Sequence, residues 1–188
     1  MRINKQVAFG LALVAASAAA SAQGYGVISV GTARLDADCA GTTSCDKTGT
    51  AFKLMGGYKF APNLAWEVGY FDFGKARAAD GSVAGEIKTN AFGGGVAFHQ
   101  DLSSAWNFVA RGGLARVKTK ITGTVGSASA SDSDNSVQPY LGLGIGYKLN
   151  KTMSIDGAWD FTRSKYDKNG ATFKGNVNAF SLGLSFGF

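Results

Sequence analysis

The sequence predicts an all-β fold, an eight-stranded antiparallel up-and-down transmembrane β-barrel. Three observations lead to this prediction. Segments of about ten residues alternate large apolar with small or polar side chains, as strands with one oily face do. The chain is rich in glycine and aromatics, with 27 Gly, 13 Phe and six Tyr in 188 residues, and aromatics favour pleated surfaces. Short connections also alternate with long ones, as in a meander with two unlike ends.

The first element is a targeting segment, residues 1–22. It begins with two basic residues, continues through the apolar run 7–14 and ends in small residues before Gln23. This pattern predicts a secretory signal peptide cleaved between Ala22 and Gln23, which leaves residues 23–188 as the barrel domain. The alternative is an N-terminal membrane anchor, but the apolar run is shorter than the roughly 20 residues that cross a bilayer.

Period-two alternation then predicts eight strands. The last is the clearest, because one face carries five large apolar residues while the other carries only Ala, Ser and Gly. The large residues are Phe180, Leu182, Leu184, Phe186 and Phe188. The facing of the first strand stays open. The predicted strands are 25–34, 52–60, 64–70, 89–98, 106–118, 137–148, 153–161 and 176–188.

The connections place the two ends of the barrel. Short joints are expected near residues 61–63, 99–104 and 149–152, and long polar loops near 35–50, 74–88, 119–136 and 162–175. In outer-membrane barrels, short turns face the periplasm and long loops face outward. Residues 123–136 are almost entirely Gly, Ala, Ser and Asp, so we expect a mobile loop there.

The polar side chains decide which face meets lipid. A soluble lipocalin-like carrier would enclose its apolar face around a ligand. Here the face opposite the aromatics carries charged groups, which would cost several kcal/mol in lipid. That face is therefore the predicted lumen, and the oily face meets lipid. We expect the lumen to be plugged by its side chains, because eight strands leave an interior that side chains just fill. The predicted polar network is Lys53, Glu67, Arg111, Gln138, Asp156 and Asp160.

The two cysteines predict a disulfide. Cys39 and Cys45 lie in a polar stretch that will meet an oxidising compartment after export. So small a ring would stabilise the fold by roughly 2 kcal/mol in the loop-closure model. Two free thiols are the alternative. A metal site has little support, because two cysteines without a nearby histidine supply half a ligand set.

One segment resembles a known family. The run GYKFAPNLAWEVGY at 57–70, followed by DFG, is similar to the second hairpin of the OmpA-like transmembrane barrels. Residues 110–116, ARGGLAR, resemble that family's fifth strand, and the alternation that ends in Phe188 resembles its C-terminal assembly signal. The resemblance implies a Gram-negative outer membrane and an interior glutamate at Glu67. Arg111 is the basic partner that we choose for Glu67, and we expect no peptidoglycan-binding domain of the kind that longer relatives carry.

The function predicted from these features is non-enzymatic: to contribute to membrane structure and present loops at the cell surface. No catalytic, cofactor or metal residues are expected. The lone histidine, His99, is expected to be a solvated turn residue at the periplasmic end, far from outer-leaflet lipid A. The alternatives are a narrow ion-conducting porin, a surface adhesin and an enzyme that modifies lipid A.

The expected partners follow from the same location. They are outer-membrane lipid and lipopolysaccharide, the outer-membrane assembly machinery and host surface ligands. Nucleic acid is excluded by export and by the scattered lysines, and a monomer is expected. One charged cluster could bind lipopolysaccharide phosphates, although we favour its interpretation as ordinary solvated loop charge. This cluster combines Arg163, Lys165, Asp167 and Lys168 with Lys118 and Lys120.

Overall fold

Nine antiparallel strands make up the part of the chain that the structure describes. The computed structural model describes residues 23–36, 42–168 and 171–188. No helix in these ranges is long and apolar enough to span a bilayer. The strands are β1 (Gly24–Leu35), β2 (Ser44–Asp46), β3 (Thr48–Ala61), β4 (Leu64–Asp80), β5 (Val83–Asp101), β6 (Trp106–Val125), β7 (Ala128–Lys148), β8 (Met153–Lys168) and β9 (Ala171–Gly187).

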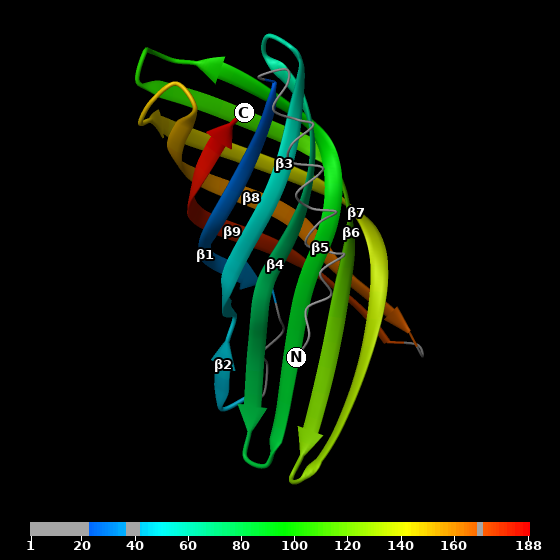
Figure 1. Ribbon diagram of the computed structural model, residues 1–188. Helices are drawn as coiled ribbons and strands as arrows, with labels where there is room; N and C mark the ends of the chain where they lie inside the picture. The colour runs from blue at the N-terminus through cyan, green and yellow to red at the C-terminus, as the bar shows by residue number, and fades with distance from the viewer. Residues whose placement is uncertain (1–22, 37–41, 169–170) are drawn as a thin grey trace, which may run out of the picture.

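Eight of these strands close into a barrel (Figure 1). β1 pairs with both β3 and β9, and the ladder continues through β8, β7, β6 and β5. β5 then pairs with β4, which already pairs with β3, so each of the eight long strands has two neighbours. The eight predicted strands are confirmed. The short β2 is an addition, paired with the far part of β4.

The two ends of the barrel differ as predicted, but two of the long loops are not loops. β4 and β5 run on to a two-residue Gly-Ser turn at Gly81, and β6 and β7 do the same at Gly126. Both glycines have positive φ, 57° and 59°, which suits the turns of tight hairpins. Figure 1 shows these hairpins extending from the barrel at the end opposite the C-terminus.

The prediction of a mobile loop at 123–136 is therefore wrong. Gly123 lies opposite Ala130, and the ladder continues in register from there into the barrel. The partner segment of β6 explains the pairing, because it is rich in threonine and other β-branched residues that favour strands. The composition of the segment itself does not indicate that its partner on β6 is rich in residues that favour strands.

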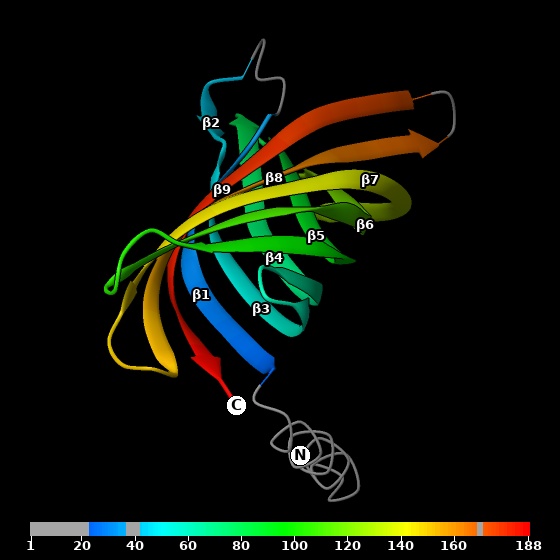
Figure 2. The same ribbon diagram turned by 90° about the horizontal axis from the view of Figure 1, so that it is seen from above.

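β7 and β8 separate above the barrel. The last pair at the outer end is Leu141 with Phe161, and Pro139 lies two residues before Leu141 in the sequence, towards the outer end of β7. Proline has no N–H to donate, so the ladder cannot continue through it on that side. Thr162 Oγ1 donates to the Pro139 carbonyl at 2.9 Å instead. Seen from above in Figure 2, the β8–β9 and β6–β7 hairpins run towards the same side of the barrel as two separate pairs of strands.

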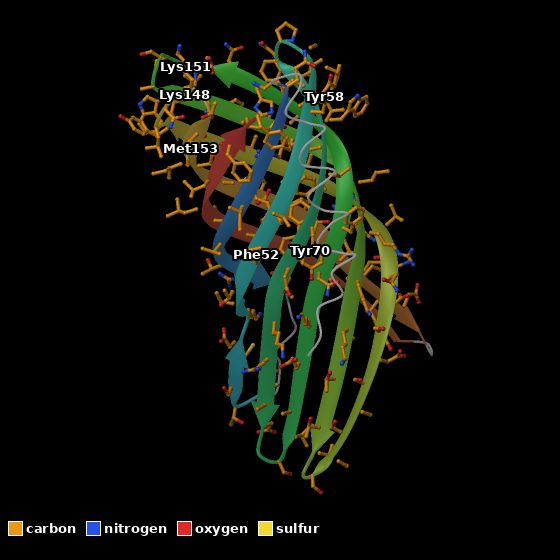
Figure 3. The ribbon with its side chains drawn as sticks, in the orientation of Figure 1. Phe52, Tyr58, Tyr70, Lys148, Lys151 and Met153 are labelled. Atoms are coloured by element: carbon orange, nitrogen blue, oxygen red, sulfur yellow. The ribbon has the colours of Figure 1, made fainter. Side chains whose placement is uncertain are left out.

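Side chains alternate between the two faces of the wall. Phe180 and Leu182 are 63% and 68% exposed on the outside, whereas Ala179, the residue before Phe180, points inward and is 3% exposed. The facing of the first strand is now defined, because Val27 is buried inside and Val30 is exposed outside. The outward aromatics include Tyr58, near the short-turn end in Figure 3, and Phe52 and Tyr70, nearer the long hairpins.

Candidate functional site in the barrel lumen

Two buried ion pairs cross the middle of the lumen. Lys53 Nζ on β3 lies 2.6 Å from Asp160 Oδ2 on β8, and Arg111 Nε on β6 lies 2.9 Å from Glu67 Oε2 on β4. All four side chains are at most 7% exposed. Because alternate residues of each strand face lipid, the residues between them, including these four, point to the inner face. Because charges taken out of water need close partners, each cation is held by a carboxylate from another strand.

A tyrosine completes each pair. Tyr25 OH donates to Glu67 Oε1, and Tyr140 OH donates to Asp160 Oδ1, both at 2.6 Å. Each carboxylate thus receives a cation on one oxygen and a phenol on the other. Sequence reasoning missed both tyrosines, because it places aromatic side chains on the oily face that meets lipid. For Tyr140 the signal was present, since it is out of phase with the outward Leu141.

The structure brings four of the six predicted network residues together and leaves two apart. Asp156 accepts a hydrogen bond from Ser154 Oγ at 2.8 Å, nearer the short-turn end. It is four residues from Asp160, about 13 Å along an extended strand, so it cannot reach the central layer. Gln138 is half-buried and has no side-chain hydrogen bond to any residue that the structure describes.

An apolar plug lies on the long-hairpin side of the ion pairs. The Phe71 ring packs against Tyr140 with centroids 4.8 Å apart, and Phe73 is 2% exposed. Beyond them, Thr119 Oγ1 and Ser164 Oγ are 3.0 Å apart, which joins β6 to β8 across the interior. Val117, two residues before Thr119 on the inner face of β6, is also fully buried. The described residues therefore close the lumen on this side.

A cavity opens on the other side, at the short-turn end. Its volume is about 700 Å³, and Lys53 and Arg111 form its inner wall. Lys148 and Lys151, labelled in Figure 3, lie at its mouth, where Lys148 pairs with Asp101 at 2.7 Å.

His99 lines this cavity, which corrects the expectation of a solvated turn residue. His99 Nε2 is 2.9 Å from Tyr25 OH, and the two rings meet edge to face. β5 runs past the expected turn to Asp101, so His99 is a strand residue that points inward. Within the described ranges, no three His, Cys, Asp or Glu side chains could hold a metal ion.

The long hairpins carry ion pairs of a different kind. Lys75 Nζ and Arg77 Nε lie 2.8 and 3.0 Å from the two oxygens of Glu86, across the β4–β5 ladder. Hydrogen bonds from Lys75 and then Arg77 lower the pKa of Glu86 from its usual value. These side chains are exposed to solvent, in contrast to the central layer.

The predicted charged cluster is split between two strands. Lys118 and Lys120 lie on β6, whereas Arg163 and Lys165 lie on β8, with β7 between them in the strand order. Lys165 pairs with Asp167 at 3.3 Å. The cluster is therefore not one site.

Some predicted residues fall outside the described ranges. The cleavage site after Ala22 and the side chain of Lys168 are among them. Cys45 lies in β2, opposite Ala78, but Cys39 is not described, so the disulfide ring stays a prediction.

Solved structures of small outer-membrane proteins share this fold. Ail, the attachment invasion locus protein of Yersinia pestis, is 20% identical, with 88% of this chain and 99% of that chain covered and a TM-score of 0.55. Neisserial surface protein A is 15% identical, with 88% and 97% covered and a TM-score of 0.60. OprG of Pseudomonas aeruginosa is 18% identical, with 88% and 96% covered and a TM-score of 0.55.

The family follows from the sequence as well as from the fold. A search of curated proteins finds no match. The family model described as "Outer membrane protein beta-barrel domain" matches residues 7–188, almost the whole chain. Outer-membrane barrels have short periplasmic turns and longer outward connections, and the short turns and long hairpins of this chain, like its OmpA-like resemblance, agree with this architecture. The chain therefore belongs to the outer membrane protein β-barrel domain family of the Gram-negative outer membrane.

Proposed function

We propose that this protein is a closed, non-enzymatic barrel that contributes to the structure of the outer membrane and presents rigid hairpins at the cell surface. The observation that carries the proposal is the lumen. Two buried ion pairs span it, and an apolar plug above them separates the periplasmic cavity from the exterior. A side-chain-filled interior favours a scaffold over a pore.

Conductance tests the closed lumen. Purified mature protein, inserted into a planar lipid bilayer, is expected to give current indistinguishable from that of the protein-free membrane, because buried side chains of the described residues, Phe71 and Tyr140 among them, fill the lumen. Insertion is checked independently by the heat-dependent gel mobility of the folded barrel recovered from the same lipid. Discrete current steps that change in size in the Glu67→Ala variant would contradict the proposal and favour the narrow porin.

The position of His99 supports the non-enzymatic part of the proposal. An enzyme acting on lipid A by acyl transfer would need a nucleophile and a base near the outer leaflet. The only histidine lies instead in the periplasmic cavity, hydrogen-bonded to Tyr25.

The hairpins support surface presentation. β4–β5 and β6–β7 continue well beyond the apolar belt as paired strands, so they hold their side chains in a fixed frame. Host surface ligands are the partners that we propose for them. One solved structure of Ail, 22% identical to this chain, is a complex with the heparin analogue sucrose octasulfate. That ligand is the first one to test.

Trimming the β6–β7 hairpin tests presentation. Deleting residues 121–132 and joining Lys120 to Ser133 through an Asn-Gly turn removes the tip and keeps the barrel ladder. We expect normal folding, measured by heat-dependent mobility, and at least a tenfold loss of attachment of bacteria to host cells, because the removed tip presents Thr, Ser and Ala side chains for such contacts. Unchanged attachment by the trimmed barrel would remove this hairpin from the proposed function.

Assembly and oligomeric state belong to the same proposal. The last strand ends with outward Phe186 and Phe188, and we propose that this row is the signal that the assembly machinery binds. We also propose that the barrel is a monomer.

A further inference from the structure

Three cations follow one another on the outer face of β6. Arg116, Lys118 and Lys120 are exposed, and they alternate with Val117 and Thr119, which are fully buried inside. None of the three forms an ion pair with any residue in the described part of the chain. They therefore present three uncompensated charges on the wall of the barrel, not on a loop.

Their height on the wall places them at the outer membrane boundary. Trp106 is exposed at the periplasmic end of β6, and ten residues separate it from Arg116. At roughly 3.3 Å per residue and a tilt of about 40°, ten residues rise about 25 Å, which is the height of the apolar band of such barrels. Leu114, 62% exposed, is the last apolar side chain below Arg116.

The neighbouring strands support this placement. Arg116 lies between Phe92 on β5 and Val137 on β7, which are 63% and 67% exposed. Lys118, two residues farther out, lies between two asparagines, Asn90 and Asn135. The change from apolar to polar neighbours therefore occurs between Arg116 and Lys118.

The nearby acids are engaged elsewhere. Asp72 lies 3.1 Å from Lys88, the residue opposite Lys120. On β7, Asp132 accepts a hydrogen bond from Tyr166, and Asp134 accepts one from the Asp167 backbone. Both β7 acids thus bind towards the β8–β9 hairpin. The outer face of β6 keeps its positive charge.

We propose that Arg116, Lys118 and Lys120 bind the phosphate groups of a phosphorylated glycolipid in the outer leaflet, the lipid A part of lipopolysaccharide. Arg116 has the planar donor fork that matches a phosphate, and the two lysines add point charges above it. Their apolar stems can lie along the wall while their heads reach the headgroups. The outward Leu114 and Phe92 offer a surface for the acyl chains of the same lipid.

The test compares two charge-removed variants. Arg116→Gln/Lys118→Gln/Lys120→Gln removes the proposed site, and Lys59→Gln/Lys151→Gln/Arg163→Gln removes the same residue types from other exposed positions. Each protein is placed in phosphatidylcholine nanodiscs with bisphosphorylated or dephosphorylated lipid A, and bound lipid A per barrel is measured by native mass spectrometry. A cation near an anionic membrane contributes about fivefold in affinity, so three contribute roughly 100-fold.

The expected result is that wild type and the control variant prefer bisphosphorylated lipid A, and that the first variant loses this preference. Equal retention of both lipids by wild type, or equal loss in both variants, would overturn the proposal. Inorganic phosphate is added as a competitor to distinguish a lipid headgroup site from a free phosphate site. Lipid A that stays bound supports the proposal, and lipid A that is displaced by phosphate would overturn it. If the first variant loses sucrose octasulfate binding yet keeps lipid A, the site takes soluble glycans and the proposal is wrong. None of these outcomes depends on whether the lumen conducts.

Discussion

Replacing Glu67 with alanine is expected to lower the free energy of unfolding by about 3–5 kcal/mol, because breaking a buried pair leaves an uncompensated charge. Arg111 would lose its carboxylate at 2.9 Å, and Tyr25 would lose the acceptor of its hydroxyl. The measurement is urea-induced unfolding in phospholipid vesicles, followed by tryptophan fluorescence. Glu67→Gln keeps an acceptor for Tyr25 but removes the charge, so its loss should be smaller.

A matched control is available on the same chain. Glu86 also binds two cations, Lys75 and Arg77, but on an exposed hairpin. Ion pairs of this kind contribute about 1 kcal/mol or less, so Glu86→Ala should change the free energy of unfolding little. Equal losses in Glu67→Ala and Glu86→Ala would show that burial in the lumen adds nothing to the pairing. The closed central layer would then not be a determinant of stability.

The barrel wall was predictable because its signal is local. Alternation in 180–188 and in 52–60 defines both the strand and its two faces, whatever strand lies next to it. The hairpin extensions were not predictable in this way. Within the segment 123–136, residues 128–136 form a strand because β6 pairs with them, and this partner lies across a turn that starts at Gly126.

The partners in the lumen were beyond reach for a different reason. That Lys53, Glu67, Arg111 and Asp160 face inward follows from strand phase alone. Which cation meets which carboxylate depends on strand stagger and closure, which no single strand encodes. Asp156 and Asp160 have the same phase, yet only Asp160 reaches the level of Lys53. Phase gives the face of a residue, and the relative register of distant strands gives its height.

Replacing Leu182 with arginine is expected to lower the free energy of unfolding by about 2–4 kcal/mol, the cost of a cation near the bilayer midplane on the lipid face of a barrel. Leu182 is 68% exposed and lies opposite Val30 and Gly157 of the flanking strands. In a soluble barrel an exposed leucine could become arginine with almost no loss. The sign and size of this change therefore test which face of the wall meets lipid.

Asn176→Arg is the control that isolates membrane depth. Asn176 lies on the same face of the same strand, six residues towards the outside, and it is already exposed and polar. Near the interface an arginine costs about 0–1 kcal/mol, so the two variants should differ by at least ~1 kcal/mol in vesicles. Arg163 lies directly opposite Asn176, and repulsion between the two arginines can only raise the cost of the control, so a larger loss in Leu182→Arg still reports the environment of the wall. Equal losses of unfolding free energy at the two positions would mean that Leu182 does not face hydrocarbon. The outer face of the wall could then accommodate charged side chains, and the inward position of Lys53 and Arg111 would no longer be explained by lipid outside.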